Sequence, residues 1–351
     1  MSATHSADEA QGILGRYFRY ADGVWPNLLG MSYATLGWLA GMVLLALAPG
    51  AWKLAGVMLT AHTMVIAAYY LHEFAHLSIF RTAQANARWG ALMTWITGAC
   101  YARFADIRNK HVRHHVDRAD VLTYDYKALL QRYPALRDVV LVLEWAYVPA
   151  VEMIMHGYVM LMPFIVPGHA ARRVHVIGVM AVRGAALLAL GWISPAGLLG
   201  YGVAYLLMIH VLRFADAYQH TYDAFAVLEE GSAIPANRVR DRAYEQRNTY
   251  SNVVLPGNAL ANLLLLNFSY HNAHHERPIE PWYRLPALHA RLFTADYAQV
   301  LPMGSLLAAY HRYRVRRLIS EDYGEVVETP DGQLSAQGFY GAVGVSFLTA
   351  V

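Results

Sequence analysis

Charged residues are scarce in this chain. Only 15% of its 351 residues are Asp, Glu, Lys or Arg, against about 25% in soluble domains, and 56% are hydrophobic. The formal net charge of +3 is too small to suggest a nucleic-acid partner. A low content of charged residues is typical of proteins embedded in a lipid bilayer, because ionised side chains are costly in its interior.

Cysteine is almost absent. The single residue, Cys100, excludes an intrachain disulfide and an iron–sulfur cluster held by this chain alone. The sequence also has no dinucleotide fingerprint and no HPGG haem motif, so no cofactor-binding residues of those kinds are expected. Residues 1–10 are polar and include Asp8 and Glu9, which does not resemble a cleavable signal peptide. We expect the chain to insert through its own apolar segments.

Apolar runs, in contrast, are long. Four of them can each cross a hydrocarbon core of about 30 Å as a helix. They pair across short turns at Pro49-Gly50 and at Ser194-Pro195. The sequence therefore predicts an all-α integral membrane protein whose four transmembrane helices form two hairpins. The predicted spans are about residues 28–48, 52–70, 174–193 and 196–212.

Histidine is present in clusters. HEFAH has spacing i, i+4, and KHVRHH and YHNAHH both have spacing i, i+3, i+4. On a helix each spacing places its imidazoles on one face, and neutral imidazole is the commonest metal ligand in proteins. Eight such residues exceed the ligands of one zinc site, which indicates two metal ions. They are His72, His76, His111, His114, His115, His271, His274 and His275.

The three motifs must lie on one side of the membrane if they share a metal site. Residues 139–166 are apolar but contain Glu144 and Glu152, and a single crossing there would separate the third motif from the others. We therefore predict that this segment and the shorter run 89–102 lie in the membrane interface. Lys and Arg crowd the histidine side, which predicts that the motifs and both termini are cytoplasmic.

These expectations divide the chain into three parts. They are a cytoplasmic N-terminal segment, 1–27, a membrane domain with a helical cap that carries the motifs, 28–299, and a cytoplasmic C-terminal tail, 300–351. Arg183 falls near the middle of the third span. We expect it to face the interior of the helix bundle, and the sequence identifies no partner for it.

HxxxH, HxxHH and a distant second HxxHH, interleaved with apolar spans, resemble the membrane-bound fatty acid desaturase and hydroxylase superfamily, which uses a histidine-box, non-haem di-iron centre. The resemblance covers residues 28–289, most of the chain. It implies two iron ions, O₂ as co-substrate, a fatty-acyl substrate from the bilayer, and no catalytic residue beyond the metal ligands. Related desaturases place a further histidine after the last span, often with an amide four residues earlier. Here these positions are His220, the ninth expected ligand, and Asp216, which departs from the amide pattern.

Four carboxylates are candidates to orient the imidazoles by accepting the second ring proton. They are Asp216, Glu73, Asp117 and Glu276. Electrons must come from a separate donor, of ferredoxin or cytochrome type. A basic face is its candidate docking site, although contact with lipid headgroups explains the same charges. The face comprises Arg103, Arg108, Lys110 and Arg113.

Several reactions stay open at this point. Oxygen-dependent desaturation is favoured by resemblance, chiefly through the compact first motif and the segment RFADAYQHTY, but a fatty acid or carotenoid hydroxylase or ketolase would use the same ligands. His72-Glu73-Phe74-Ala75-His76 also matches HExxH, the pattern of an intramembrane zinc protease, which leaves the other motifs unexplained. A haem or metal transporter should place its histidines within the spans, where only His62, His175 and His210 lie.

Overall fold

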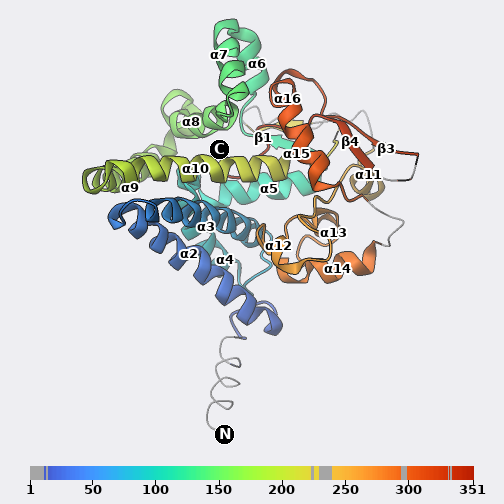
Figure 1. Ribbon diagram of the computed structural model, residues 1–351, viewed down its shortest axis with the longest axis horizontal. Coiled ribbons are helices and arrows are strands. Elements are labelled where there is room, and N and C mark those ends of the chain that lie inside the picture. The colour runs from blue at the N-terminus through green and yellow to red at the C-terminus, as the bar shows by residue number, and fades with distance from the viewer. Residues whose placement is uncertain are drawn as a thin grey trace.

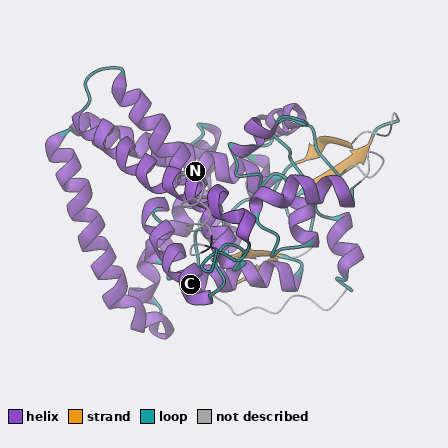
Figure 2. Cartoon of the chain, turned by 90° about the horizontal axis from the view of Figure 1, so that it is seen from below, coloured by secondary structure: helices purple, strands orange, loops and turns teal. Residues whose placement is uncertain are grey.

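The computed structural model describes residues 15–222, 225–228, 239–293, 299–330 and 334–351, together with Gly12 and Gly332. The other residues of the predicted N-terminal segment, 1–11 and 13–14, lie outside this part. The described chain is mostly helical, with two small two-stranded sheets beside the helices (Figures 1 and 2).

Four helices of the described chain are long and apolar enough to cross a membrane. They are α2 (Val24–Leu47), which follows the short helix η1 (Ala21–Gly23), α3 (Trp52–Ala75), α9 (Arg173–Ile193), which follows η3 (Pro167–Arg172), and α10 (Pro195–Ala217). Gly50 has a φ of +50° in the first turn, and the Ser194 hydroxyl accepts a hydrogen bond from the Gly197 amide in the second. The prediction of four helices in two hairpins is confirmed.

The predicted ends of the second and fourth spans were too early. Helix α3 continues five residues past position 70 and carries His72 in its last turn, and α10 continues five residues past position 212. Polar residues in these last turns suggested that the chain had left the apolar region. They lie inside the protein instead, and the exposed fractions of His72, Glu73 and Arg213 are 1%, 3% and 6%.

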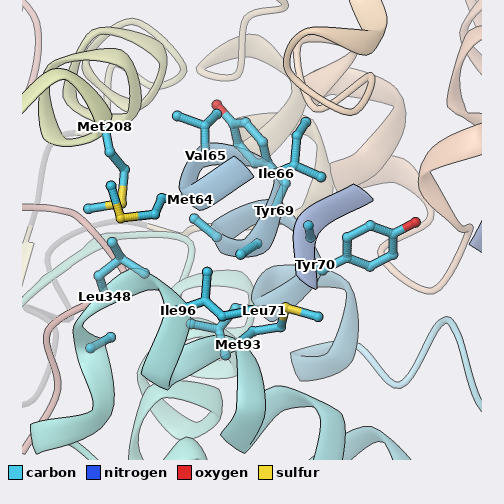
Figure 3. Close-up of a cluster of buried hydrophobic side chains, with 14 of the residues drawn as sticks. Met64, Val65, Ile66, Tyr69, Tyr70, Leu71, Met93, Ile96, Met208 and Leu348 are labelled. Carbon is cyan, nitrogen blue, oxygen red and sulfur yellow. The ribbon is translucent and has the colours of Figure 1, made fainter. Parts of the chain in front are cut away.

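Helix α3 lies at the centre of the core. It packs against α2, α4 (Ala83–Thr97) and α10. Figure 3 shows residues of α3 such as Met64 and Leu71 surrounded by Met93 of α4, Met208 of α10 and Leu348 from the C-terminal segment. Close approach needs small residues, since a Cβ at Gly41 would lie 2.4 Å from Thr60 Oγ1.

The segment 139–166 forms parts of two separate helices. They are α7 (Pro134–Trp145) and α8 (Ala150–Ile165), separated by a turn in which Tyr147 has a φ of +61°. Neither is among the helices long enough to cross a membrane, and α4 is also too short, in agreement with the sequence prediction. In Figure 1, α8 lies on the opposite side of α10 from α2 and α3.

Most of the remaining elements lie at the end of the bundle where α3 and α10 finish, while α6 lies beside α7 (Figure 1). Strand β1 pairs with β2 in parallel, and β3 pairs with β4 in antiparallel fashion. In chain order the elements are η2 (Ala99–Tyr101), α5 (Phe104–Asp117), β1 (Asp120–Leu122), α6 (Tyr126–Arg132), β2 (Phe225–Val227), α11 (Arg242–Arg247), α12 (Ala259–Leu263), α13 (His271–Glu276), η4 (Trp282–Arg284), α14 (Leu285–Leu292), α15 (Met303–Arg312), α16 (Arg316–Ile319), β3 (Gly324–Glu328) and β4 (Leu334–Phe339).

Residues 342–350 re-enter the core after β4. Leu348 and Ala350 belong to the main apolar cluster, with 2% and 0% of their surfaces exposed. The sequence offered no signal for this path, because an apolar segment of this length is common in exposed tails. It is a part of the fold that only the structure reveals.

Arg183, the unexplained charge of the third span, has partners on neighbouring elements. Its guanidinium donates hydrogen bonds to the Trp95 carbonyl (3.0 Å) and to the Tyr201 hydroxyl (2.9 Å). Its Nη1 also lies 3.9 Å from Cys100 Sγ. The charge therefore faces the bundle interior, as predicted, and is solvated by groups of α4 and α10.

A buried ionic triad fastens α7 and α8 to α10. Arg213 Nη1 lies 2.6 Å from Glu144 Oε2, and Arg213 Nε lies 3.2 Å from Glu152 Oε1. All three side chains are almost completely buried. Removing one member of such a group leaves the others charged and unpaired in a low-dielectric site.

Arg213→Met should therefore lower the free energy of unfolding by about 3–5 kcal/mol, since Glu144 and Glu152 would stay buried without a counter-charge. Thermal unfolding of the detergent-solubilised protein measures the effect. As a matched control, the same substitution combined with Glu144→Gln and Glu152→Gln should recover most of the loss. A melting temperature unchanged by Arg213→Met alone would contradict the assignment.

Candidate metal centre

Each of the three histidine motifs lies on a helix or at its end. His72 lies in the last turn of α3 and His76 is the residue that ends this helix. The second motif lies on α5. In the first turn of this helix, the Arg103 amide donates a hydrogen bond to Asp106 Oδ2, and the Asp106 amide donates one to the Arg103 carbonyl. The third motif forms the six-residue helix α13, and His220 follows α10.

These elements bring the nine predicted ligands into two groups. Within each group, one potential ligand atom from every residue lies within 4.8 Å of the others. The first group, from α3, α5 and α13, comprises His72, His76, His111, His115 and His274. The second group, from α5, α13 and the end of α10, comprises His114, His220, His271 and His275.

Ring nitrogens face one another inside both groups. In the first group, His76 Nε2 lies 2.5 Å and His115 Nε2 lies 3.2 Å from His111 Nε2. In the second group, His220 Nε2 lies 3.1 Å from His114 Nε2 and 2.9 Å from His271 Nε2. A neutral imidazole has one N–H donor, so several converging rings cannot satisfy each other by hydrogen bonds alone.

The converging ring nitrogens fit metal ions. The buried ring nitrogens with no hydrogen-bond partner among the described residues are both nitrogens of His72, Nε2 of His275, and Nδ1 of His115, His271 and His274. In the last three rings it is Nε2, the other nitrogen, that faces a neighbouring ring. An all-imidazole set of converging nitrogens suits iron, zinc, copper or nickel. Two ions, one in each group, would satisfy the convergent nitrogens.

The protonation state of the rings agrees with that role. Burial, followed by the proximity of other imidazoles, lowers the pKa of six ligand candidates outside the spans well below its usual value. This holds for His76, His111, His115, His220, His271 and His274. For His275, burial lowers the pKa to about 4 despite the nearby carboxylate of Glu245. Each ring is therefore neutral near pH 7, which is the form that binds metal.

Glu245 of α11 is a functional candidate that sequence reasoning missed. Its Oε1 lies 2.8 Å from His275 Nδ1, and Arg118 Nε donates to its Oε2 at 2.9 Å. A carboxylate in this position fixes the tautomer of a ligating ring and raises its basicity. The ligand atoms of Glu245, His115 and His275 also lie within 4.8 Å of one another. No motif surrounds Glu245 in the sequence, so spacing could not have found it.

Two further contacts orient rings of the second group. His114 Nδ1 lies 2.9 Å from the Ala119 carbonyl and 3.6 Å from Asp120 Oδ1. His220 Nδ1 lies 3.3 Å from Thr249 Oγ1. The distal nitrogens of both rings are therefore occupied, which directs the opposite nitrogens to the centre of the group.

Two of the four predicted orienting carboxylates lie near the ligands. Glu73 Oε1 is 3.7 Å from His72 Nδ1, while its Oε2 accepts hydrogen bonds from Ser78 Oγ (2.7 Å) and the Trp282 amide (3.1 Å). Asp216 lines a cavity beside His111, His114, His220 and His271, and its Oδ1 is buried without a partner in the described chain.

The other two predicted carboxylates engage arginines instead. Asp117 Oδ2 lies 2.7 Å from Arg113 Nε, and Glu276 pairs with Arg242. Nearness in sequence was not sufficient here, because successive residues on a helix point about 100° apart, so Glu276 after His275 and Asp117 two residues after His115 face other partners. No contact in the described chain links either group to a ring nitrogen of the two histidine groups.

The cavity beside the ligands has a volume of about 50 Å³, enough for a few water molecules or another small molecule. Its polar lining includes Lys110, Asp120, Asp216 and Gln219, and its apolar lining includes Val121, Phe268, Val345 and Phe347. The cavity therefore places both polar and apolar side chains beside ligands of the two groups.

Lys110 does not belong to an exposed basic face, contrary to the sequence prediction. Only 2% of its surface is exposed, and Nζ donates to Thr123 Oγ1 and to the carbonyls of Ser346 and Thr349 at 2.7–3.0 Å. The lysine next to His111 thus anchors the C-terminal segment. Phe347 of that segment lies with its ring centre 6.0 Å from that of His72.

Glu245→Gln should weaken metal binding by about tenfold, because the amide removes the negative charge that supports His275. Retention of Fe²⁺ by purified protein during titration with a chelator measures this loss. Glu276→Gln is the matched control and should bind metal like the parent protein, since Glu276 pairs with Arg242. Equal retention by the Glu245 and Glu276 variants would refute the role of Glu245.

Comparison with known proteins identifies the family. A search of the curated proteins found no match. Residues 49–307, well over half of the chain, match the family described as fatty acid desaturase. This range contains both hairpin turns, all three histidine motifs and His220. The two histidine groups and four candidate membrane-spanning helices agree with that assignment, and the chain belongs to the fatty acid desaturase family.

Proposed function

We propose that the protein is an O₂-dependent fatty-acyl desaturase with two irons, one held by each histidine group. The observation that supports it best is the division of nine imidazoles, most of them buried, into a group of five and a group of four. Two irons bound there would supply the reduction of O₂ and the removal of hydrogen from an unactivated methylene. Family membership supports an oxidoreductase that acts on a lipid.

The chain's own residues have four tasks in this proposal. The nine imidazoles hold the irons, and Glu245 and Thr249 keep His275 and His220 in the orientation that ligation requires. Phe268 and Phe347 line the cavity beside the ligands and exclude bulk water from an apolar chain. Asp216 and Lys110 give the same cavity a polar side where water or protons can be accommodated. Hydroxylation would use the same arrangement, and the product distinguishes the two reactions.

Glu73 gives the zinc-protease alternative no support. A metalloprotease requires this glutamate to act as general base on a metal-bound water. Here its carboxylate accepts hydrogen bonds from Ser78 and the Trp282 amide, and His72 and His76 lie among three further histidines. The contacts favour a structural role in joining the end of α3 to η4.

We also propose that the histidine groups and both termini are cytoplasmic, and that a separate ferredoxin or cytochrome supplies electrons. Arg172 and Arg173 lie at the start of the third span, on the histidine side. At the other end, Lys53 is held by the Leu45 carbonyl and Ser194 Oγ, so it joins the two hairpin turns. This asymmetry follows the positive-inside rule.

Iron content tests the two-site proposal. The purified parent protein should contain about two irons per chain. His114→Ala and His115→Ala change adjacent residues of different groups, so each variant should retain about one iron, with a different Mössbauer spectrum. His311→Ala is the control and should retain both, because His311 contacts Tyr147 and belongs to neither group. One zinc per chain in the parent protein would overturn the proposal.

The reaction is tested by lipid mass spectrometry after expression in a bacterial host under ¹⁶O₂ and ¹⁸O₂. Desaturation gives a product lighter by two hydrogens and without label, and purified enzyme should need an added ferredoxin or cytochrome with its reductase. The His274→Ala variant should give no product, since it removes a ligand of the first group. Label retained in an alcohol or ketone would identify a hydroxylase or ketolase instead.

Sidedness is tested by cysteine labelling in intact cells. Ala51→Cys, in the exposed turn before α3, should react with a membrane-impermeant maleimide added outside. Ile279→Cys, 41% exposed and next to the third motif, should react only after lysis. The native Cys100 is buried and contributes little background. Labelling of both positions from the same side would refute the topology.

A further inference from the structure

Arg183 carries its charge deep inside the membrane-spanning part of the chain. It lies ten residues from either end of α9, Arg173–Ile193, which is about 15 Å at the helical rise of 1.5 Å per residue. An ionised side chain at this depth is costly unless the groups around it compensate the charge. A charged residue within a span therefore marks a candidate binding site.

The groups that contact this guanidinium carry no negative charge. Nη1 donates to the Trp95 carbonyl and lies 3.9 Å from Cys100 Sγ, and Nη2 donates to the Tyr201 hydroxyl. These contacts use fewer than the five N–H donors of a guanidinium. No carboxylate of the described chain lies within ion-pair distance, whereas Arg213 of α10 contacts two carboxylates. Arg183 is therefore a cation that the protein solvates but does not neutralise.

Two cavities have Arg183 in their walls. A groove of about 480 Å³ lies mainly between α8, α9 and α10, and a cavity of about 180 Å³ lies mainly between α2, α4 and α9. Leu187 and Tyr201 line both of them. Most of the other lining side chains are apolar or aromatic, so the guanidinium is a single charge beside two apolar spaces.

Two further polar groups belong to the wall of the larger groove. His156 Nδ1 lies 2.8 Å from the Glu152 carbonyl, and His156 Nε2 is buried without a partner in the described chain. At Gly98, φ is +81°, and a Cβ would lie 3.2 Å from the Tyr205 hydroxyl oxygen and 3.3 Å from Arg183 Nη2. The lack of a side chain at Gly98 therefore lets this hydroxyl and the guanidinium converge.

Helix α9 makes few buried contacts of its own. Val176, Val179 and Leu190 are the buried residues among its 21. The rest of the helix faces lipid or the two cavities. A molecule that fills the larger groove would therefore add contacts between α9 and both α8 and α10.

We propose that the larger groove is a second lipid site, which binds a long-chain carboxylic acid with its carboxylate on Arg183 and Tyr205. A carboxylate matches the guanidinium in charge and in the geometry of two parallel hydrogen bonds. The phosphate of a phospholipid keeps its charge and stays at the membrane surface, about 15 Å away. A carboxylic acid can reach this depth in its neutral form, and it releases its proton to the solvent when it binds beside the cation.

This site is separate from the metal centre. The two cavities beside Arg183 share no lining residue with the cavity beside the histidine groups, and none of the nine ligand candidates lines them. The bound acid joins α9 to the bundle and is not the molecule that reacts, so the proposal holds whichever reaction the metal centre performs. It makes the stability of the α9–α10 hairpin depend on free carboxylic acid in the membrane.

Photolabelling of the iron-loaded protein in phosphatidylcholine nanodiscs tests the proposal, with a palmitic acid that carries a diazirine next to its carboxyl group. Labelled peptides should come from α8, α9 and α10. Excess palmitic acid should suppress the labelling, and methyl palmitate should not. Arg183→Gln should lower the labelling by about tenfold, because a charge-assisted hydrogen bond is lost. Arg173→Gln is the matched control on the same helix, since Arg173 donates to the Pro163 carbonyl and lines neither cavity.

A second variant and a second measurement keep the charge and the fold apart. Gly202→Leu should lower the labelling with Arg183 in place, because Gly202 lines the groove and a Cβ there meets no atom within 4 Å. Palmitic acid should raise the melting temperature of the parent protein and of the Arg173 variant, but not that of the Arg183 variant, since a ligand stabilises only the protein that binds it.

Four outcomes would overturn the proposal. They are equal labelling of the Arg183 variant and the parent protein, displacement by methyl palmitate as readily as by palmitic acid, displacement by lysophosphatidic acid but not by palmitic acid, and labelling confined to the peptides that carry the histidine motifs. If the Arg183 variant does not fold, Gly202→Leu with unchanged melting temperature and iron content decides the matter. Unreduced labelling of that variant would then refute the site.

Discussion

The gathering of nine imidazoles in two groups is the constraint on which the rest of this structure depends. Several Nε2 atoms lie within 3.2 Å of one another, and a neutral imidazole has only one N–H to donate. To bring them together, the end of α3, all of α5, the residue His220 after α10 and the short helix α13 must meet at one point. The central position of α3 in the bundle follows from that requirement.

Cationic side chains in this apolar protein are accommodated in three different ways. Arg183 is solvated by a carbonyl and a hydroxyl, Arg213 by two carboxylates, and Lys110 by a hydroxyl and two carbonyls. Each arrangement joins elements that are distant in sequence. The few charges that the composition permits therefore act as fixed links between the spans, the second motif and the C-terminal segment.

Local patterns predicted the spans correctly in outline and selected histidines that the structure brings together, because apolar length and histidine spacing are properties of single segments. The same reasoning failed where the outcome depends on distant contacts. The last turns of α3 and α10 are covered by the cap, so their polar residues did not mark the membrane boundary. Glu245 contacts His275 from 30 residues away, and Lys110 is buried by residues 346 and 349. No periodicity encodes such contacts.

The ligand candidates come from distant parts of the chain, and this distance determines the order in which parts of the fold form. The α2–α3 hairpin is made of neighbouring segments, whereas His72 and His275 are about 200 residues apart and Phe347 lies further still. Contacts between distant segments form late, because the entropy of closing long loops must first be overcome. The hairpins can therefore settle in the bilayer early, while the pocket for the ions is completed only once residues 342–350 have packed behind α5. Any ion bound by the two histidine groups would therefore be loaded after membrane insertion.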